Sequence, residues 1–96
     1  MPIMSIPVSA IIPTKDRANI LKRTLESLLL QDVHPKELIV IDASDNDQSK
    51  VVLEEISFPV HTTVYYQKAK LPGAATQRMQ GIDIIGMRHK PFYLPE

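Results

Sequence analysis

Polar and charged side chains follow each of three apolar segments in this 96-residue sequence. In chain order they are Thr14, Lys15, Asp16 and Arg17, then Asp42, Ser44, Asp45 and Asp47, then Gln67, Lys68, Lys70 and Arg78. Carboxylates accept hydrogen bonds from a base or a ribose, and a guanidinium group pairs with a phosphate through two parallel hydrogen bonds. If the three segments end at one edge of a sheet, these side chains meet around one polar ligand.

Asp42 is the first candidate for contact with that ligand. It directly follows Leu38-Ile39-Val40-Ile41, a run that is apolar on both faces of a strand, so we expect its carboxylate at the rim where a ligand binds. The alternative is a turn or a helix cap, for which aspartate is also favoured. Asp45 or Asp47 is better placed to cap the helix that follows, which favours the binding interpretation for Asp42.

Two other groups of residues also have both a chemical and a structural interpretation. Asp45-Asn46-Asp47 has the D-x-D spacing with which carboxylates chelate a metal ion, but its place between a strand and a helix favours capping. Arg78 follows Pro72-Gly73 and the small residues 74–76, which would let an anion approach the N-terminus of a helix. The alternative for Arg78 is an exposed side chain in solvent.

The spacing of the apolar residues predicts the elements that must position these groups. Strands are expected at 8–12, 37–42 and 60–66, and helices at about 20–29, 51–56 and 74–84. The order βαβαβα predicts an α/β fold with a parallel sheet and right-handed crossovers, in which ligands bind outside the carboxyl ends of the strands. Asp16 is expected to cap the first helix. Phe92 and Tyr93 can begin a further strand, which Pro91 confines to an edge or a strand start.

Composition excludes several classes of protein. The formal net charge of zero argues against nucleic acid or an anionic membrane as partner, because both require an excess of lysine and arginine. A chain without cysteine has no thiol or disulfide chemistry and fits the reducing cytoplasm. Gly73, Gly81 and Gly86 cannot form the glycine-rich loop of a dinucleotide or P-loop site. No apolar run approaches the ~18 residues of a transmembrane helix, and the histidines lack the spacing of a zinc site.

Three segments resemble family-2 glycosyltransferases. Residues 8–17 are similar to that family's V-S-V-I-I-P-T-Y-N-R, and residues 25–31 with 37–42 are similar to L-x-S-L-L-x-Q followed by P-x-E-I-I-V-V-D. Residues 73–82 are similar to G-x-x-x-A-R-N-x-G-I. The similarity covers residues 8–82 in the same order and spacing, so it is much more specific than any one motif.

The resemblance implies part of a glycosyltransferase A-type, Rossmann-like fold that binds a nucleoside-diphosphate sugar, most often a UDP-sugar, for transfer to an acceptor hydroxyl. By that matching Pro13 and Thr14 lie against the uridine, Asp42 contacts the base, and Arg78 reaches the base or the diphosphate. The residues implied in nucleotide binding are Pro13, Thr14, Asp16, Arg17, Asp42, Ser44 and Arg78. The family as a whole implies Mg²⁺ or Mn²⁺ on the diphosphate.

The chain also departs from the family pattern. Lys15-Asp16 replaces Tyr-Asn, Ala43 replaces a second aspartate, and Gln77 and Met79 flank Arg78. Where the family has F-L-D-D-D, whose acids hold the metal, this chain offers only Glu96. We therefore expect one partial domain over residues 1–96 with a divergent tail at 83–96, truncated or frameshifted near residue 83. It would have no metal site, no catalytic base and no efficient transfer on its own.

Two other functions remain open from sequence. The chain could be a non-catalytic nucleotide-binding or interaction module that self-associates through an open sheet edge. A phospho-acceptor receiver domain would need an acidic pair after the first strand and an acceptor aspartate after the third. Those positions hold Pro13-Thr14 and Gln67-Lys68, so this last interpretation is the weakest.

Overall fold

The computed structural model describes residues 4–86 and 90–93. Along the chain the elements are β1 (Met4–Thr14), α1 (Ala18–Leu29), β2 (Val33–Asp42), α2 (Gln48–Glu55), β3 (Thr63–Lys68), α3 (Ala74–Ile85) and β4 (Lys90–Tyr93). The strands of this part of the chain form one parallel sheet in the order β3-β2-β1-β4. The predicted parallel α/β fold is confirmed, and β4 is an edge strand where Phe92 and Tyr93 predict one.

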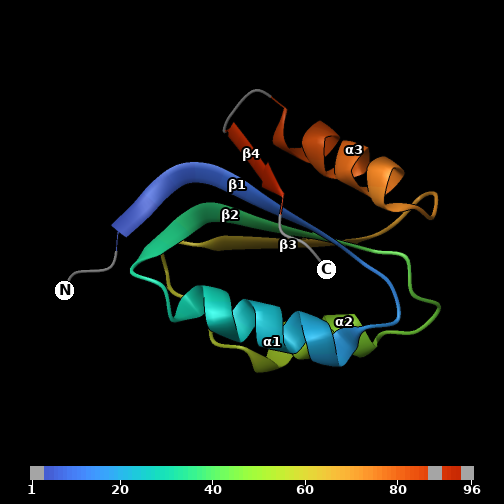
Figure 1. The fold of residues 1–96 in the computed structure, drawn as a ribbon, viewed down its shortest axis with the longest axis horizontal. Coiled ribbons are helices and arrows are strands. Elements are labelled where there is room, and N and C mark those ends of the chain that lie inside the picture. The colour runs from blue at the N-terminus through green and yellow to red at the C-terminus, as the bar shows by residue number, and fades with distance from the viewer. Residues whose placement is uncertain (1–3, 87–89, 94–96) are drawn as a thin grey trace.

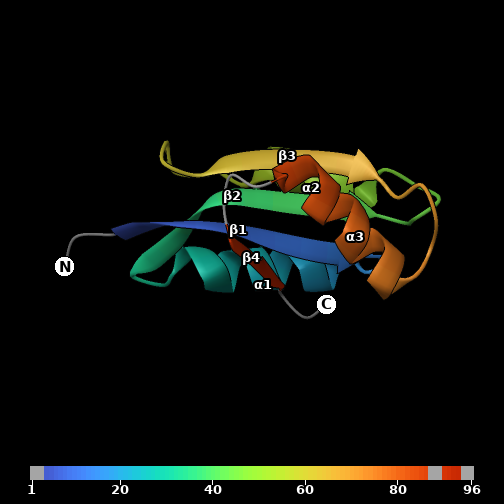
Figure 2. The ribbon, with the colours of Figure 1, turned by 90° about the horizontal axis from the view of Figure 1, so that it is seen from above.

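The helices cover both faces of the sheet, α1 and α2 on one face and α3 on the other (Figures 1 and 2). This follows from the alternation of side chains along the strands. Toward α1 and α2, Ala10, Ile12, Leu38 and Val40 pack with Leu21, Leu25, Val52 and Leu53. Toward α3, Ile11, Ile39 and Ile41 pack with Ile85. The central strand β2 is therefore apolar on both faces, as its sequence predicts.

The strand order brings three carboxyl ends together. The chain steps from β1 to β2 to β3 in one direction, and α3 then crosses to the other face and leads to β4 on the far side of β1. Thr14 at the end of β1 pairs with Asp42 at the end of β2, and Asp42 in turn pairs with Lys68 at the end of β3. Ligands of such sheets bind beside a strand where the winding reverses, which here is β1.

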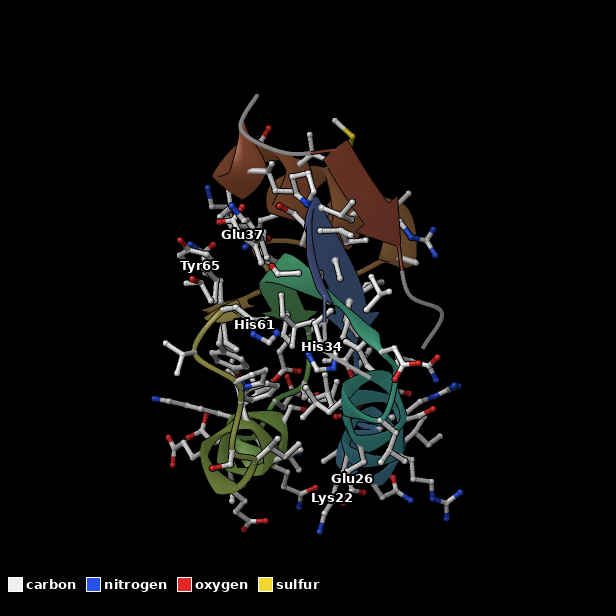
Figure 3. All side chains as sticks on the ribbon, turned by 90° about the vertical axis from the view of Figure 1, so that its left-hand side faces the viewer. Lys22, Glu26, His34, Glu37, His61 and Tyr65 are labelled. Carbon is white, nitrogen blue, oxygen red and sulfur yellow. The ribbon has the colours of Figure 1, made fainter. Side chains whose placement is uncertain are left out.

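A pair of histidines, His34 and His61, lies at the opposite end of the sheet (Figure 3). His34, at the start of β2, is buried, and its Nε2 lies 3.1 Å from the carbonyl oxygen of Leu29. Because a carbonyl can only accept, His34 Nε2 carries the proton. In the neutral ring its Nδ1 then accepts from Nε2 of His61, which lies 2.9 Å away. These bonds connect the end of α1, the start of β2 and the turn before β3, which gives both side chains a structural role.

Some predicted boundaries are wrong for identifiable reasons. Asp16 does not cap α1: Arg17 occupies the N-cap position, and Asp16 has a φ of 54° with its N–H turned toward Ser44. The third strand begins at Thr63 and not at residue 60, because Thr62 N–H donates to the carbonyl of Pro59 in a turn. No helix of the described residues has the length and apolar character needed to cross a membrane.

Gly81 gives a first testable prediction, because α3 lies close to the sheet at this residue. A Cβ at this position would lie 2.7 Å from Cγ2 of the buried Ile11. We expect Gly81→Ala to lower the free energy of unfolding by about 1–2 kcal/mol in urea denaturation, since overpacking costs more than the ~1 kcal/mol that alanine gains in a helix. In an Ile11→Ala background the same change should become neutral or stabilising. An equal loss in both backgrounds would contradict the steric explanation.

Candidate functional site

A hollow of about 430 Å³ lies between the carboxyl end of β1 and the first turn of α3. We call it the strand-end hollow; its lining is Pro13, Thr14, Lys15, Arg17, Gly73, Ala74, Gln77 and Arg78. Of the predicted nucleotide-binding residues it brings together Pro13, Thr14, Arg17 and Arg78. The lining contains three cationic side chains and no acidic one among the described residues. The hollow is therefore suited to an anionic ligand.

The N-terminus of α3 contributes to the same wall. Gly73 occupies the N-cap position with a φ of 121°, a conformation that favours glycine, and Gly73 and Ala74 both line the hollow. The hydroxyl of Thr76 donates to the carbonyl of Gly73 at 2.9 Å, and this bond fixes the entry to the helix. Free N–H groups of a first helical turn attract anions, in agreement with the cationic lining.

Gln77 joins α3 to the ends of two strands. Its side chain is buried, and Nε2 donates to the carbonyls of Thr14 at 3.1 Å and Ile41 at 2.8 Å. Its Oε1 accepts from the N–H of Gly73 at 3.2 Å. The sequence identifies Gln77 only as a departure from a family motif. Its function as a cross-link depends on the spacing between helix and sheet, which the sequence does not give.

Asp42, Ser44 and Asp16 lie beside the hollow and do not line it. The Asp42 side chain is fully buried, and its Oδ1 accepts from Ser44 N–H at 2.9 Å while Oδ2 accepts from the hydroxyl of Tyr66 at 2.6 Å. Ser44 Oγ accepts from the N–H of Asp16 at 2.6 Å. Asp42 is at the predicted strand end, and its two oxygens accept from the Ser44 N–H of the β2–α2 loop and from the Tyr66 hydroxyl of β3. Contact of this carboxylate with a ligand stays a prediction.

The D-x-D segment surrounds a lysine. Lys68 Nζ donates to the carbonyl of Ser44 at 3.0 Å and that of Asn46 at 2.5 Å, and it lies 3.7 Å from Asp47 Oδ1. Asn46 Oδ1 accepts from Gln48 N–H at 3.1 Å, so the segment does support the start of α2, whereas Asp47 makes no side-chain capping bond.

The described donor groups do not fit a divalent metal. No three His, Asp or Glu side chains of residues 4–86 and 90–93 gather in one place. The ammonium of Lys68 already stands among the oxygens of the D-x-D loop. Glu96, the one acid that the sequence offers near the family's metal position, lies outside the described residues.

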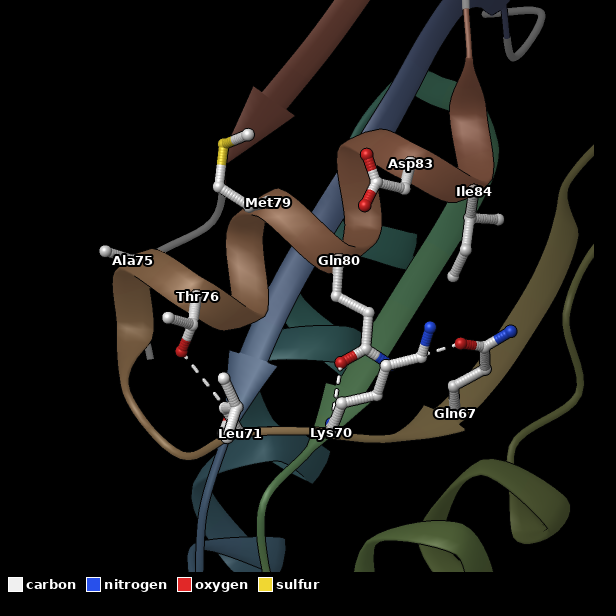
Figure 4. A pocket seen from close by; sticks show the side chains of 9 residues that line it. All are labelled: Gln67, Lys70, Leu71, Ala75, Thr76, Met79, Gln80, Asp83 and Ile84. Atoms are coloured by element: carbon white, nitrogen blue, oxygen red, sulfur yellow. Dashed lines mark hydrogen bonds between the residues drawn. The ribbon is translucent and has the colours of Figure 1, made fainter.

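A second hollow of about 480 Å³ lies between the end of β3 and the middle of α3 (Figure 4). Its floor is the amide of Gln80, whose Oε1 accepts from Lys70 N–H and whose Nε2 donates to Gln67 Oε1 and to the carbonyl of Lys68. The charged groups of its lining are Lys70 and Asp83, which oppose each other in sign. Although it is larger, this hollow lacks the cationic character of the strand-end hollow.

The bond between Tyr66 and Asp42 yields a pH prediction. Burial, the hydrogen bond to Asp42 and the charges of Asp42 and Asp47 raise the pKa of the Tyr66 hydroxyl well above its ordinary value of 10.0. Because the folded pKa exceeds the unfolded one, the bond contributes stability below about pH 10 and loses it as the pH rises further. Tyr66→Phe should cost about 1–3 kcal/mol at pH 7 in urea denaturation, and less above pH 10.

Tyr65→Phe is the matched control for this prediction, because the Tyr65 hydroxyl has no hydrogen bond to a described residue and no such loss is expected. In a spectrophotometric titration, the tyrosine ionisation at the highest pH should be absent in Tyr66→Phe and present in Tyr65→Phe. An unchanged high-pH titration in Tyr66→Phe would contradict the assignment.

Gln77→Glu tests the cross-link between α3 and the strands. At neutral pH a carboxylate would face the carbonyls of Thr14 and Ile41, and we expect a loss of about 3 kcal/mol in urea denaturation. At acidic pH the protonated acid regains a donor, so the difference from wild type should shrink. Gln31→Glu, the same change on an exposed side chain, should leave stability within ~0.5 kcal/mol. Equal effects at the two positions would contradict this account.

The family model described as glycosyl transferase family 2 matches residues 9–86. No curated protein sequence matches this chain. The matched range runs from the middle of β1 through α3 and includes all residues that line the strand-end hollow. Apart from residue 8, it also covers the three segments whose motifs resemble this family. With this agreement of motifs, parallel α/β fold and family model, the chain belongs to glycosyl transferase family 2.

Proposed function

We propose that this chain binds the nucleotide part of a UDP-type nucleoside-diphosphate sugar in the strand-end hollow. The observation that carries the proposal is the group of Lys15, Arg17 and Arg78 around the hollow, beside the N-terminus of α3. Membership of a glycosyltransferase family supports a donor that carries a diphosphate, and a volume of about 430 Å³ falls within the usual range for small-molecule sites.

The lining supports one orientation of the donor. The diphosphate would lie among the cationic side chains, where guanidinium groups can pair bidentately with phosphate oxygens. The base and ribose would lie against Pro13 and Thr14 at the end of β1, two buried residues that offer an apolar ring and a hydroxyl.

Asp42, Ser44 and Asp16 would act by holding the loop that carries Lys15 and Arg17. Their mutual hydrogen bonds and the burial of the Asp42 carboxylate support this role. Contact between Asp42 and the base stays a prediction, since it requires the carboxylate to exchange one of its present partners.

The proposed reaction of the family domain is sugar transfer to an acceptor hydroxyl. The acceptor oxygen bonds to the anomeric carbon, the bond from that carbon to the diphosphate breaks, and the hydroxyl proton passes to a base. No described residue is assigned as that base or as a metal ligand. The part proposed for this chain is donor recognition.

Isothermal titration calorimetry with UDP tests the proposal. We expect Arg17→Ala and Arg78→Ala each to raise the Kd for UDP about 10-fold or more, because each removes a charge-assisted contact with phosphate. Arg23→Ala, an exposed arginine of α1 outside the lining, should leave the Kd unchanged. UDP should also bind more tightly than ADP. No binding at millimolar UDP, or equal binding by all three variants, would refute the proposal.

A further inference from the structure

The ammonium of Lys68 lies inside a shell of oxygen atoms from the loop between β2 and α2. We call this shell the cation cradle; it consists of the carbonyls of Ser44 and Asn46 and the carboxylates of Asp42 and Asp47. Nζ donates to the two carbonyls at 3.0 and 2.5 Å and lies 3.7 Å from one oxygen of each carboxylate. Such an oxygen shell is the environment that a bound cation would have.

The backbone of Lys68 is held on two sides, which fixes where its side chain begins. Lys68 is the last residue of β3 and pairs with Asp42 on β2. Its carbonyl accepts from Gln80 of α3 at 2.9 Å, and the next N–H, of Ala69, donates to the carbonyl of Asp42 at 2.8 Å. The side chain is 44% exposed, so solvent weakens its ion pairs, and the hydrogen bonds to the loop carbonyls matter more.

The cradle is connected to the strand-end hollow through Ser44. The carbonyl of Ser44 accepts from Lys68, and its N–H donates to Asp42. Its hydroxyl oxygen accepts from the N–H of Asp16. Asp16 has a φ of 54°, in the left-handed region that few non-glycine residues adopt, although aspartate does so more often than most. Its two sequence neighbours, Lys15 and Arg17, line the hollow.

We propose that Lys68 is a positioning residue of the donor site. Its ammonium is a tethered cation that holds the β2–α2 loop, so that Ser44 can fix Asp16 and thereby place the cationic residues on either side of it. Lys68 itself does not line the hollow. The inference rests on the proposed nucleotide binding. In it, the Lys68 ammonium occupies the position beside the D-x-D loop where the D-x-D spacing would suggest a metal ion.

Three variants of the full chain test the inference. Lys68→Met keeps most of the side-chain length and removes the charge, and Lys68→Arg keeps the charge. Lys70→Met is the matched control, because Lys70 is an exposed lysine that lines the other hollow and has no hydrogen bond to the cradle. We expect Lys68→Met to raise the Kd for UDP about 10-fold by calorimetry. Lys68→Arg should restore most of the affinity, and Lys70→Met should match wild type.

Amide hydrogen exchange, followed by NMR without nucleotide, gives a second readout. The N–H of Asp16 should exchange about 10-fold faster or more in Lys68→Met, because its acceptor Ser44 is no longer held. Ser44→Ala removes that acceptor directly and should weaken UDP binding to a similar extent. The double variant Lys68→Met/Ser44→Ala should bind UDP no more weakly than either single variant, since both act through one connection.

The outcomes separate this inference from the proposed function. If Lys68→Met binds UDP like wild type and Asp16 exchange is unchanged, the positioning role is refuted, even where the melting temperature falls. Additive losses in the double variant would also refute it. If wild type does not bind UDP, the proposed function fails. The connection from Lys68 to Asp16 is then supported or refuted by the exchange rates alone.

Discussion

A fully buried carboxylate must be surrounded by hydrogen-bond donors, because an ion without partners is too costly to bury. At Asp42 these donors are the Ser44 N–H and the Tyr66 hydroxyl, with the Lys68 ammonium nearby. The first comes from the β2–α2 loop, and the other two come from β3. The partners needed by this one carboxylate therefore determine how β2, β3 and the β2–α2 loop meet, and through Ser44 they reach the β1–α1 loop.

On the other face of the sheet, Gln77 provides hydrogen-bond donors to buried oxygen atoms. The carbonyls at the ends of β1 and β2 would be buried under α3, and the Gln77 amide provides a donor to both. Asp42 and its partners thus hold the strand ends on the side of α1 and α2, and Gln77 holds them on the side of α3. Gln77 lines the strand-end hollow and the Asp42 group lies beside it, so these hydrogen bonds help the sheet to place the lining.

The sequence predicts the features that depend on local patterns and leaves out those that depend on distances between elements. The apolar run before Asp42 identifies a central strand, and Pro72-Gly73 with the small residues after it marks the start of α3. Whether the Asp42 carboxylate is exposed or bonded within the protein depends on Tyr66, which is 24 residues away in sequence. The sequence around Tyr66 predicts only a strand and gives no sign of this hydrogen bond. The hydrogen bond from the Asp16 N–H to Ser44, 28 residues away in sequence, is likewise not predictable from the local sequence. Motif matching identifies Pro13, Thr14, Arg17 and Arg78 of the hollow's lining, and only the fold gives the other lining residues and the hydrogen-bond partners.

The distribution of charge explains how a chain with a formal net charge of zero can favour an anion. Lys68 lies between the carboxylates of Asp42 and Asp47 and offsets part of their negative potential at the strand ends. The cationic residues of the hollow approach from the β1–α1 loop and from α3, and no described carboxylate shares that lining. Local potential, and not net charge, governs the attraction of a small ligand within about one Debye length. Lys68 therefore reduces the repulsion that the acidic loop would exert on an anion close to the strand ends.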